Sequence, residues 1–260
     1  MNKEVLAAVF ATSLLVGMVI FMEIGRHLGQ RRASKDAEGA KAGLGVVEGA
    51  VFALMGLLVA FTFSGAASRF DSRRTLIIEE ANAIGTAWLR LDLLPASAQP
   101  ELRDLFRSYL DARLSVYRKL PDIEAARGEL AKASALQNGI WNRAMAACRE
   151  SGSPLTAQMI PALNQMFDIA SSRSAVSQIH PPAIIFIMLG VLALTSSMLA
   201  GFAMAGGKSR SWIHMIGFSL ILAMTVYVIL DLEFPRLGFI RVDSFDALLV
   251  ELRQSMNPAN

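Results

Sequence analysis

The chain has 260 residues, of which 53% are hydrophobic, and its formal net charge is +3. Its mean hydropathy of +0.43 exceeds that of ordinary soluble domains, so the composition indicates an integral membrane protein. The single cysteine excludes an internal disulfide and a zinc framework. Basic residues flank apolar segments or alternate with acids instead of gathering on one polar face, which excludes a nucleic-acid-binding protein.

Four apolar segments have the length and purity of membrane spans: residues 5–22, 44–67, 181–205 and 212–230. The shortest has 18 residues. A helix of that length extends roughly 27 Å, which is close to the thickness of the hydrocarbon core of a bilayer. No small-residue cleavage site follows Met22, so the first segment is predicted to be an anchored helix and not a signal peptide.

The region between the second and third spans, residues 68–180, has apolar residues at helical spacing and few glycines. Pro95 and Pro121 divide it into amphipathic helices, and no turn signal separates its start from the second span. We therefore expect an all-α integral membrane protein with four transmembrane helices and a helical-bundle domain inserted between the second and third. Residues 1–67 are expected to form the first helix pair with its basic loop, and residues 68–180 the extramembrane helical domain. Residues 181–231 are expected to form the second helix pair, and residues 232–260 an interfacial segment with the C-terminal tail.

Basic residues beside the spans predict the orientation in the membrane. The loops within the two helix pairs carry seven, and the termini carry four. Short basic loops stay in the cytoplasm, so both termini and residues 68–180 are predicted on the non-cytoplasmic side. The loop residues are Arg26, Arg31, Arg32, Lys35, Lys41, Lys208 and Arg210, and the terminal residues are Lys3, Arg236, Arg241 and Arg253.

Small residues recur along one face of the second span with spacings of three and four: Gly45, Gly49, Ala53, Gly56, Ala60, Ser64 and Ala67. Such stripes let helix backbones approach closely, and the favoured interpretation is helix packing. The alternative is a face that lines a pore. The third span has a shorter version in Gly190, Ala193, Ser197 and Gly201, so we expect the second and third spans to pack together.

Three polar residues of the second span are candidates for an ion pathway: Glu48, Thr62 and Ser64. Ionisable residues inside a span usually face a bundle interior or a water-filled path. The alternative is that these three residues have structural roles. Glu48 lies near the start of the span, where its carboxylate can reach the interface, and hydroxyls such as those of Thr62 and Ser64 can bond their own helix backbone.

A dense cluster of charges follows the last span in the segment "ILDLEFPRLGFIRVDSFD", residues 229–246. Pro235 and Gly238 prevent a simple continuation of the helix. Opposite charges alternate there with apolar residues, which favours an interfacial clasp that forms salt bridges to other helix ends; an ion site is the alternative. The clasp residues are Asp231, Glu233, Arg236 and Arg241.

No pattern in the sequence indicates catalysis. The three histidines are far apart and lack acids or cysteines at ligand spacing, so no metal site is expected. Neither a nucleophile elbow nor a phosphate-binding loop is present. We therefore expect a protein that is not an enzyme and uses no cofactor.

Several segments resemble one known family. "GLLVAFTFSGAASRFDSRRTLIIEEANAIGTAWLRLDLLP", residues 56–95, is similar to the signature of the bestrophin-like bacterial membrane proteins, a domain of unknown function. "PALNQMFDI", "HPPAIIF" and "ILDLEFPRLGFIRVD" are similar to the later segments of the same family. The resemblance therefore covers most of the chain.

The resemblance implies kinship with bestrophins, which are pentameric anion channels that keep their large domain in the cytosol, opposite to the orientation that the loop charges predict. It implies a homo-oligomeric ion channel of the bacterial inner membrane, conducting anions, with lipid, ions and further copies of the chain as partners. The alternative is a non-transporting membrane sensor or scaffold whose helical domain binds a partner.

Overall fold

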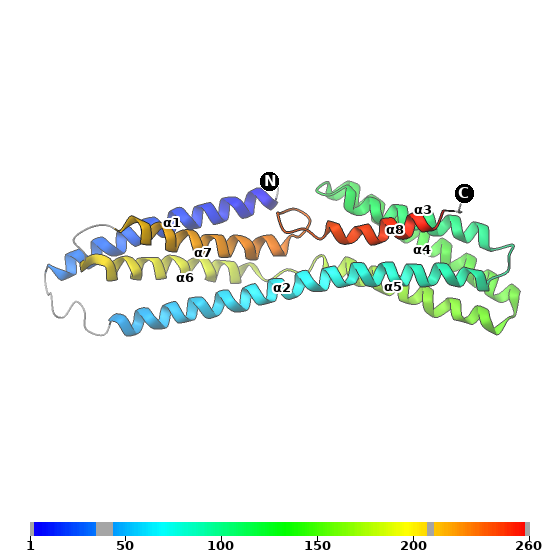
Figure 1. The fold of residues 1–260 in the computed structure, drawn as a ribbon, viewed down its shortest axis with the longest axis horizontal. Coiled ribbons are helices and arrows are strands. Elements are labelled where there is room, and N and C mark those ends of the chain that lie inside the picture. Colours follow the sequence, from blue (N-terminus) through cyan, green and yellow to red (C-terminus); the bar gives the residue numbers. More distant parts are fainter. Residues whose placement is uncertain (1–2, 35–43, 207–210, 258–260) are drawn as a thin grey trace. The chain divides into compact units, whose positions relative to one another are not determined.

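The computed structural model describes residues 3–34, 44–206 and 211–257, and every regular element among them is helical (Figure 1). Four basic residues used to predict the orientation, Lys35, Lys41, Lys208 and Arg210, lie outside this described part. The chain divides into two compact units. Unit 1 comprises Met1–Phe70 and His180–Ile240, and unit 2 comprises Asp71–Ile179 and Arg241–Asn260.

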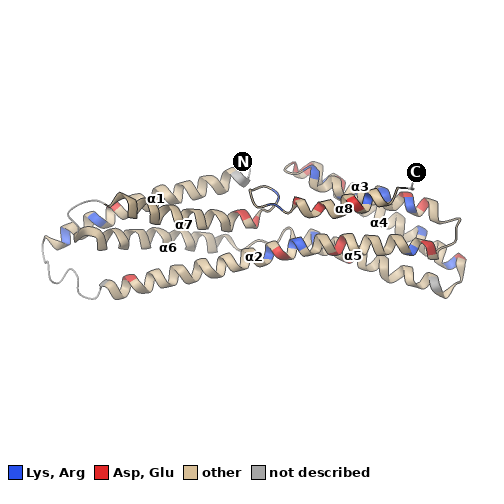
Figure 2. Ribbon diagram, in the orientation of Figure 1, with Lys and Arg blue, Asp and Glu red and all other residues tan. Residues whose placement is uncertain are grey.

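Within the described part of the chain, four helices are long and apolar enough to cross a membrane, as the sequence predicts. They are α1 (Lys3–Ala33), α2 (Leu44–Arg90), α6 (Ala183–Ala203) and α7 (Trp212–Glu233). Figure 2 shows α6 without a charged residue, and most of the charge of α7 lies at its C-terminal end. The helix α2 has 47 residues, about twice what a membrane requires. The predicted continuation of the second span beyond residue 67 is therefore confirmed.

In unit 1, α1 packs along α6 and also contacts α7 (Figure 1). Two glycines permit the close approach of α1 and α6. A Cβ atom on Gly201 would lie 1.8 Å from the carbonyl oxygen of Met22, and a Cβ atom on Gly25 would lie 1.9 Å from that of Met198. The small face of α6 thus packs against α1, whereas the sequence led us to expect α2 there. Small residues allow any helix to pack closely against the stripe, so the spacing by itself does not determine which helix is the neighbour.

The membrane-spanning part of α2 contributes one face to the core of unit 1. Met55 joins a buried cluster with residues of α1, α6 and α7 (Leu14, Met18, Ala193, Leu222 and Val226). The Phe52 ring meets Phe218 of α7 edge to face, with 6.1 Å between the ring centroids. Further along, Ala66 packs with Ile229 and Leu232 of α7. The opposite face of α2 is exposed within the protomer.

Unit 2 contains the C-terminal part of α2 together with α3 (Gln99–Arg118), α4 (Ile123–Ser151), α5 (Met159–Val176) and α8 (Ala247–Ser255). Pro100 lies in the first turn of α3, where its missing N–H costs nothing. Asp122 caps α4 by accepting a hydrogen bond from the Ala125 N–H at 3.0 Å. The buried core draws on each helix, with Ile84, Phe106, Ile140, Leu163 and Leu249 among its members.

The helix α8 was not recognised in the sequence, which we interpreted there as a tail. It packs on α3, where Arg253 donates two hydrogen bonds to the Asp111 carboxylate at 2.9 and 3.0 Å. Arg107 of α3 donates to the carbonyl oxygen of Met256 at 2.9 Å. With only nine residues, α8 is too short for its apolar residues to show a helical period that identifies it without its neighbours.

Candidate functional site

A buried ion pair lies at the C-terminal end of α7. The Glu233 carboxylate is 1% exposed and accepts hydrogen bonds from Nε of Arg69 at 2.9 and 3.2 Å. The Nδ1 atom of His180, three residues before α6, lies 3.6 Å from the second Glu233 oxygen. The His180 ring also stacks near Phe234, with 4.7 Å between centroids. Residues from α2, from α7 and from the segment before α6 therefore meet at one carboxylate.

The neighbouring Asp231 organises the turn that follows α7. Its two carboxylate oxygens accept hydrogen bonds from the backbone N–H groups of Phe239 at 3.1 Å and Ile240 at 2.8 Å. A Cβ atom on Gly238 would lie 1.6 Å from Asp231 Oδ1, so this turn can close on the carboxylate only with glycine at that position. Asp231 thus ties the chain after α7 back onto the end of that helix.

The four predicted clasp residues differ in burial, and they do not all lie in the same unit. Asp231 and Glu233 are buried next to the turn, Arg236 is half-buried, and Arg241 lies in unit 2, where its Nε donates to Asp243 at 2.6 Å. One cation that pairs with Glu233 is Arg69, which sequence reasoning did not include in the clasp. Arg69 is one of the first charged residues after the second span, and this position was the available signal.

A second buried charge cluster lies in unit 2. Glu80 of α2 is 0% exposed; it accepts a hydrogen bond from Arg113 Nε at 2.6 Å and another from Arg173. Burial by itself raises the pKa of Glu80, but the charges and hydrogen bonds of Arg113 and Arg173 outweigh it and hold the pKa below its ordinary value. Arg173 also reaches Asp246 at 2.9 Å, so the cluster connects α2, α3 and α5 with the turn before α8.

The predicted ion-pathway residues do not come together on one surface. Thr62 is 7% exposed, and its hydroxyl donates to the carbonyl oxygen of Leu58 at 2.6 Å. Ser64 is exposed on the other side of the helix, and Glu48 is half-buried near the start of α2. The predicted packing residues Gly45, Gly49, Ala53, Gly56 and Ala60 are all exposed, and a Cβ atom on any of the three glycines would meet open space.

Beyond the membrane span, the exposed face of α2 becomes polar. Seven exposed polar residues are spaced by three and four positions and therefore share one side of the helix: Ser64, Ser68, Ser72, Thr75, Glu79, Asn82 and Thr86. Asp71, Ile78 and Leu89 are exposed as well. Apolar residues precede them on the same side, among them Leu57 and Phe61, which is 68% exposed. One helix thus presents an uncovered side that changes from apolar to hydroxyl-rich and then to amide and carboxylate groups.

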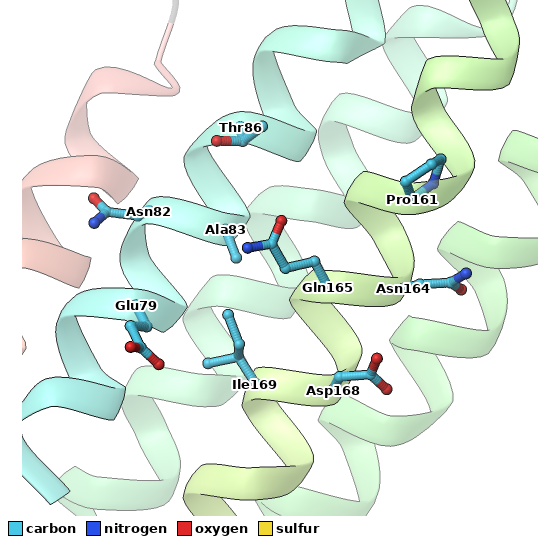
Figure 3. A pocket seen from close by; sticks show the side chains of 9 residues that line it. All are labelled: Glu79, Asn82, Ala83, Thr86, Pro161, Asn164, Gln165, Asp168 and Ile169. Atoms are coloured by element: carbon cyan, nitrogen blue, oxygen red, sulfur yellow. The ribbon is translucent and has the colours of Figure 1, made fainter. Parts of the chain in front are cut away.

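The polar end of this face borders a groove of about 750 Å³ between α2 and α5 (Figure 3). Glu79, Asn82, Ala83 and Thr86 line it from α2, and Pro161, Asn164, Gln165, Asp168 and Ile169 line it from α5. Figure 3 shows the Gln165 side chain extending toward Ala83, with Glu79 below and Asp168 on the far side of α5. Within the described residues, no three His, Cys, Asp or Glu side chains form a metal-binding group.

The fold is shared with solved membrane proteins. Three structures of a bacterial bestrophin homolog from Klebsiella pneumoniae match this chain. A tryptophan-to-alanine variant is 14% identical, covers 95% of this chain and 96% of its own, and has a TM-score of 0.68. A leucine-to-threonine variant is 16% identical, and the match covers 95% of this chain and 97% of the variant, with a TM-score of 0.68. A structure phased with zinc is 16% identical, and the match covers 94% of this chain and 96% of the homolog, with a TM-score of 0.67.

Family membership follows from a sequence model. No curated protein matches the chain in sequence. The model of the Bestrophin-like domain, by contrast, matches residues 11–245, which include every segment quoted above for the resemblance. The resemblance is thereby confirmed, and this chain belongs to the Bestrophin-like domain family.

Proposed function

We propose that this protein is a homo-oligomeric ion channel and that α2 lines its pathway. One observation carries the proposal: α2 runs unbroken from Leu44 to Arg90 and leaves one side uncovered by the protomer along its length. A pathway wall needs such a surface, because the residues that contact ions must not be buried within their own subunit. Membership of the Bestrophin-like family supports the same function.

The uncovered side of α2 also supports assembly from several copies. A face lined by Gly45, Gly49 and Gly56 has no neighbour within the protomer, although small residues usually serve close helix contacts. In the proposed assembly the glycines and alanines of this stripe, from Gly45 to Ala60, pack against the next copy. Leu57 and Phe61 look toward the axis, together with Ser64 near the end of the stripe. Glu48 stands at one end of the pathway, and Thr62 supports its wall from the inner side of α2.

We further propose that residues 68–180 form a helical domain outside the membrane, inserted between the two helix pairs. The polarity of its surface and its length support this arrangement. Its side of the membrane follows from the loop charges, which favour the non-cytoplasmic side of a bacterial inner membrane.

The second candidate function is a sensor or scaffold without transport. The exposed polar groove between α2 and α5 favours it, because such a groove suits a soluble partner. Crosslinking in native membranes separates the two candidates. A scaffold yields a second protein joined to unit 2, whereas a channel that acts alone yields only copies of this chain.

Conductance of the purified full chain in planar bilayers tests the channel directly. We expect currents above those of empty membranes, and a set of trials at varied pH, calcium concentration and voltage without any current would contradict the proposal. Gly56→Leu should reduce both the oligomer fraction and the current, because the added side chain obstructs the proposed contact between copies. Gly217→Leu on α7 is the matched control, because its Cβ position is also open within the protomer and lies outside the proposed contact.

A further inference from the structure

One arginine of α1 is buried in unit 1 without a partner for its charge. Arg26 is 7% exposed, and its Nε atom is buried and donates to no acceptor among the described residues. The nearest acid along α1, Glu23, lies 3.7 Å from Nε2 of His27, and Arg26 forms no ion pair with any of the described residues. A buried cation costs free energy unless an anion or a set of acceptors offsets it. The surroundings of Arg26 therefore call for an anion from outside this part of the chain.

The other buried arginines show that this isolation is particular to one position. Among the described residues, three further arginines are buried, and each has an acceptor. Arg113 and Arg173 both pair with the carboxylate of Glu80. Arg73 donates to the carbonyl oxygen of Ile179 at 2.9 Å. Burial of a guanidinium in this fold is thus accompanied by an acceptor everywhere except on α1.

Close packing of α1 on α6 fixes the position of Arg26. A Cβ atom on Gly25 would lie 1.9 Å from the carbonyl oxygen of Met198, and one on Gly29 would lie 2.7 Å from that of Phe202. The helix cannot turn between these two contacts to bring the whole guanidinium into water. Its two terminal nitrogens are not fully enclosed, so a ligand at the surface of unit 1 can reach them. The donor is therefore held in place before any ligand binds.

The location of Arg26 along α1 matches the depth of phospholipid headgroups. The apolar run of α1 ends at Met22, and four further residues add about 6 Å of helix. The headgroup layer on each side of the hydrocarbon core is roughly 5–8 Å thick. Arg31 and Arg32 follow in the last turn of α1 and are exposed (Figure 2). This end of the helix therefore attracts anions to the level at which lipid phosphates lie.

We propose that Arg26 binds a phosphate group, which either an anionic phospholipid headgroup or free phosphate supplies. The planar guanidinium presents parallel N–H groups that match two oxygens of a phosphate, and the ligand returns to the buried charge the counter-anion that the described residues do not provide. The loop charges predict that this end of α1 faces the cytoplasm, where anionic lipids give the leaflet its negative surface potential. The site is independent of conduction, because α1 takes no part in the proposed pathway wall.

Native mass spectrometry of the full chain in a neutral detergent tests the site, with phosphatidylglycerol as the lipid and inorganic phosphate as the free anion. We expect the native chain to bind phosphatidylglycerol at least about tenfold more tightly than Arg26→Met, because the variant has no donor. Arg26→Lys keeps the charge without the planar fork and should lie between them. Arg31→Gln removes an exposed arginine of the same helix end and is the matched control, whose affinity should stay within about threefold of native.

Thermal unfolding in the same detergent distinguishes a ligand site from a structural role. Arg26→Met should unfold at or above the native midpoint without added lipid, because it replaces a buried, unpaired charge by an apolar side chain. Added phosphatidylglycerol should then raise the midpoint of the native chain and not that of Arg26→Met. A variant that unfolds well below the native chain before lipid is added would show that Arg26 is paired within the fold, and would overturn the proposal.

The choice of probes identifies the source of the phosphate. Tighter binding of phosphatidylglycerol than of inorganic phosphate assigns the site to a lipid, and full displacement of the lipid by inorganic phosphate at equal concentration assigns it to the free anion. Diacylglycerol, which lacks the phosphate, should bind equally to the native chain and to Arg26→Met. Equal affinity of the native chain, Arg26→Met and Arg31→Gln for phosphatidylglycerol and for inorganic phosphate would contradict the proposed site, whether or not the chain conducts ions.

Discussion

Arg69 of α2 and Glu233 of α7 are 164 residues apart in the sequence, yet the Arg69 guanidinium donates hydrogen bonds to both oxygens of the Glu233 carboxylate. The two groups differ in exposure, since Glu233 is 1% exposed and Arg69 27%. Removing the arginine therefore leaves a buried negative charge, whereas removing the glutamate leaves an arginine that water can still reach. The energetic cost of breaking the pair should be asymmetric.

Arg69→Ala should lower the free energy of unfolding by about 3 kcal/mol, because the buried Glu233 carboxylate loses the guanidinium that donates to both of its oxygens. Glu233→Gln should cost less. Thermal unfolding of the protein in detergent measures both effects. Arg127→Ala serves as the control, because its partner Glu124 and Arg127 itself are both largely exposed, and its effect should stay within about 1 kcal/mol. Equal losses in all three variants would contradict the role of Arg69.

Glu80 should make the stability of unit 2 sensitive to acid. Its folded-state pKa is held below the ordinary value of 4.5, so its contribution is fully present above that pH and disappears as the pH falls through the lower folded-state pKa. The unfolding midpoint, followed by the fluorescence of Trp88 and Trp141, should therefore decrease below about pH 4.5. Glu80→Gln should lower the midpoint at pH 7 and flatten this acid dependence. A steep dependence that persists in the variant would assign it to another group.

Gly201→Ala should destabilise unit 1, because the new Cβ atom would lie 1.8 Å from the Met22 carbonyl oxygen, and a backbone atom cannot yield as a flexible side chain can. We expect a loss of about 1–3 kcal/mol in the free energy of unfolding. Gly217→Ala on α7 is the control, since its Cβ would meet no atom within 4 Å. A midpoint for Gly201→Ala that equals the control would show that α1 and α6 are not held this closely.

Labelling of single cysteines tests the proposed orientation. In a Cys148→Ala background, Ser134→Cys places a thiol on an exposed position of α4, and Ser34→Cys places one just after α1. A membrane-impermeant maleimide applied to spheroplasts should label the first and leave the second unlabelled until the membrane is permeabilised. The reverse pattern would place residues 68–180 in the cytoplasm, where bestrophins keep their large domain.

The membrane spans and the helices could be predicted from the sequence, because each depends on residues that are close together in the chain. The four apolar runs identify the spans, and the uninterrupted helical spacing from Gly56 through Arg74 predicts one helix that leaves the membrane without a turn. Adjacent residues on a helix point in different directions, so the sequence also separates Glu79 from Glu80. It does not indicate which of the two is buried, because burial depends on where α3 and α5 lie.

The partners of the polar residues were decided by tertiary structure. The sequence places Asp231 and Glu233 after the last span and recognises that charged pairs belong there, but Arg69 becomes the partner of Glu233 only when α2 and α7 lie side by side. Similarly, the small residues of α2 and α6 have similar spacings, yet Gly201 packs against α1, whereas a Cβ atom on Gly56 would meet open space.

The sequence by itself therefore determined a helical membrane protein with four spans, because hydrophobic length and helical periodicity are properties of contiguous segments. The family came from the sequence by a separate route, the resemblance of its longer motifs to those of the Bestrophin-like domain. Tertiary structure alone decided which side of α2 is left uncovered, which acids are neutralised, and that Thr62 faces the interior while Ser64 and Glu79 are exposed. These depend on contacts between segments far apart in the chain, whose energies come from burial and charge pairing that no single segment contains.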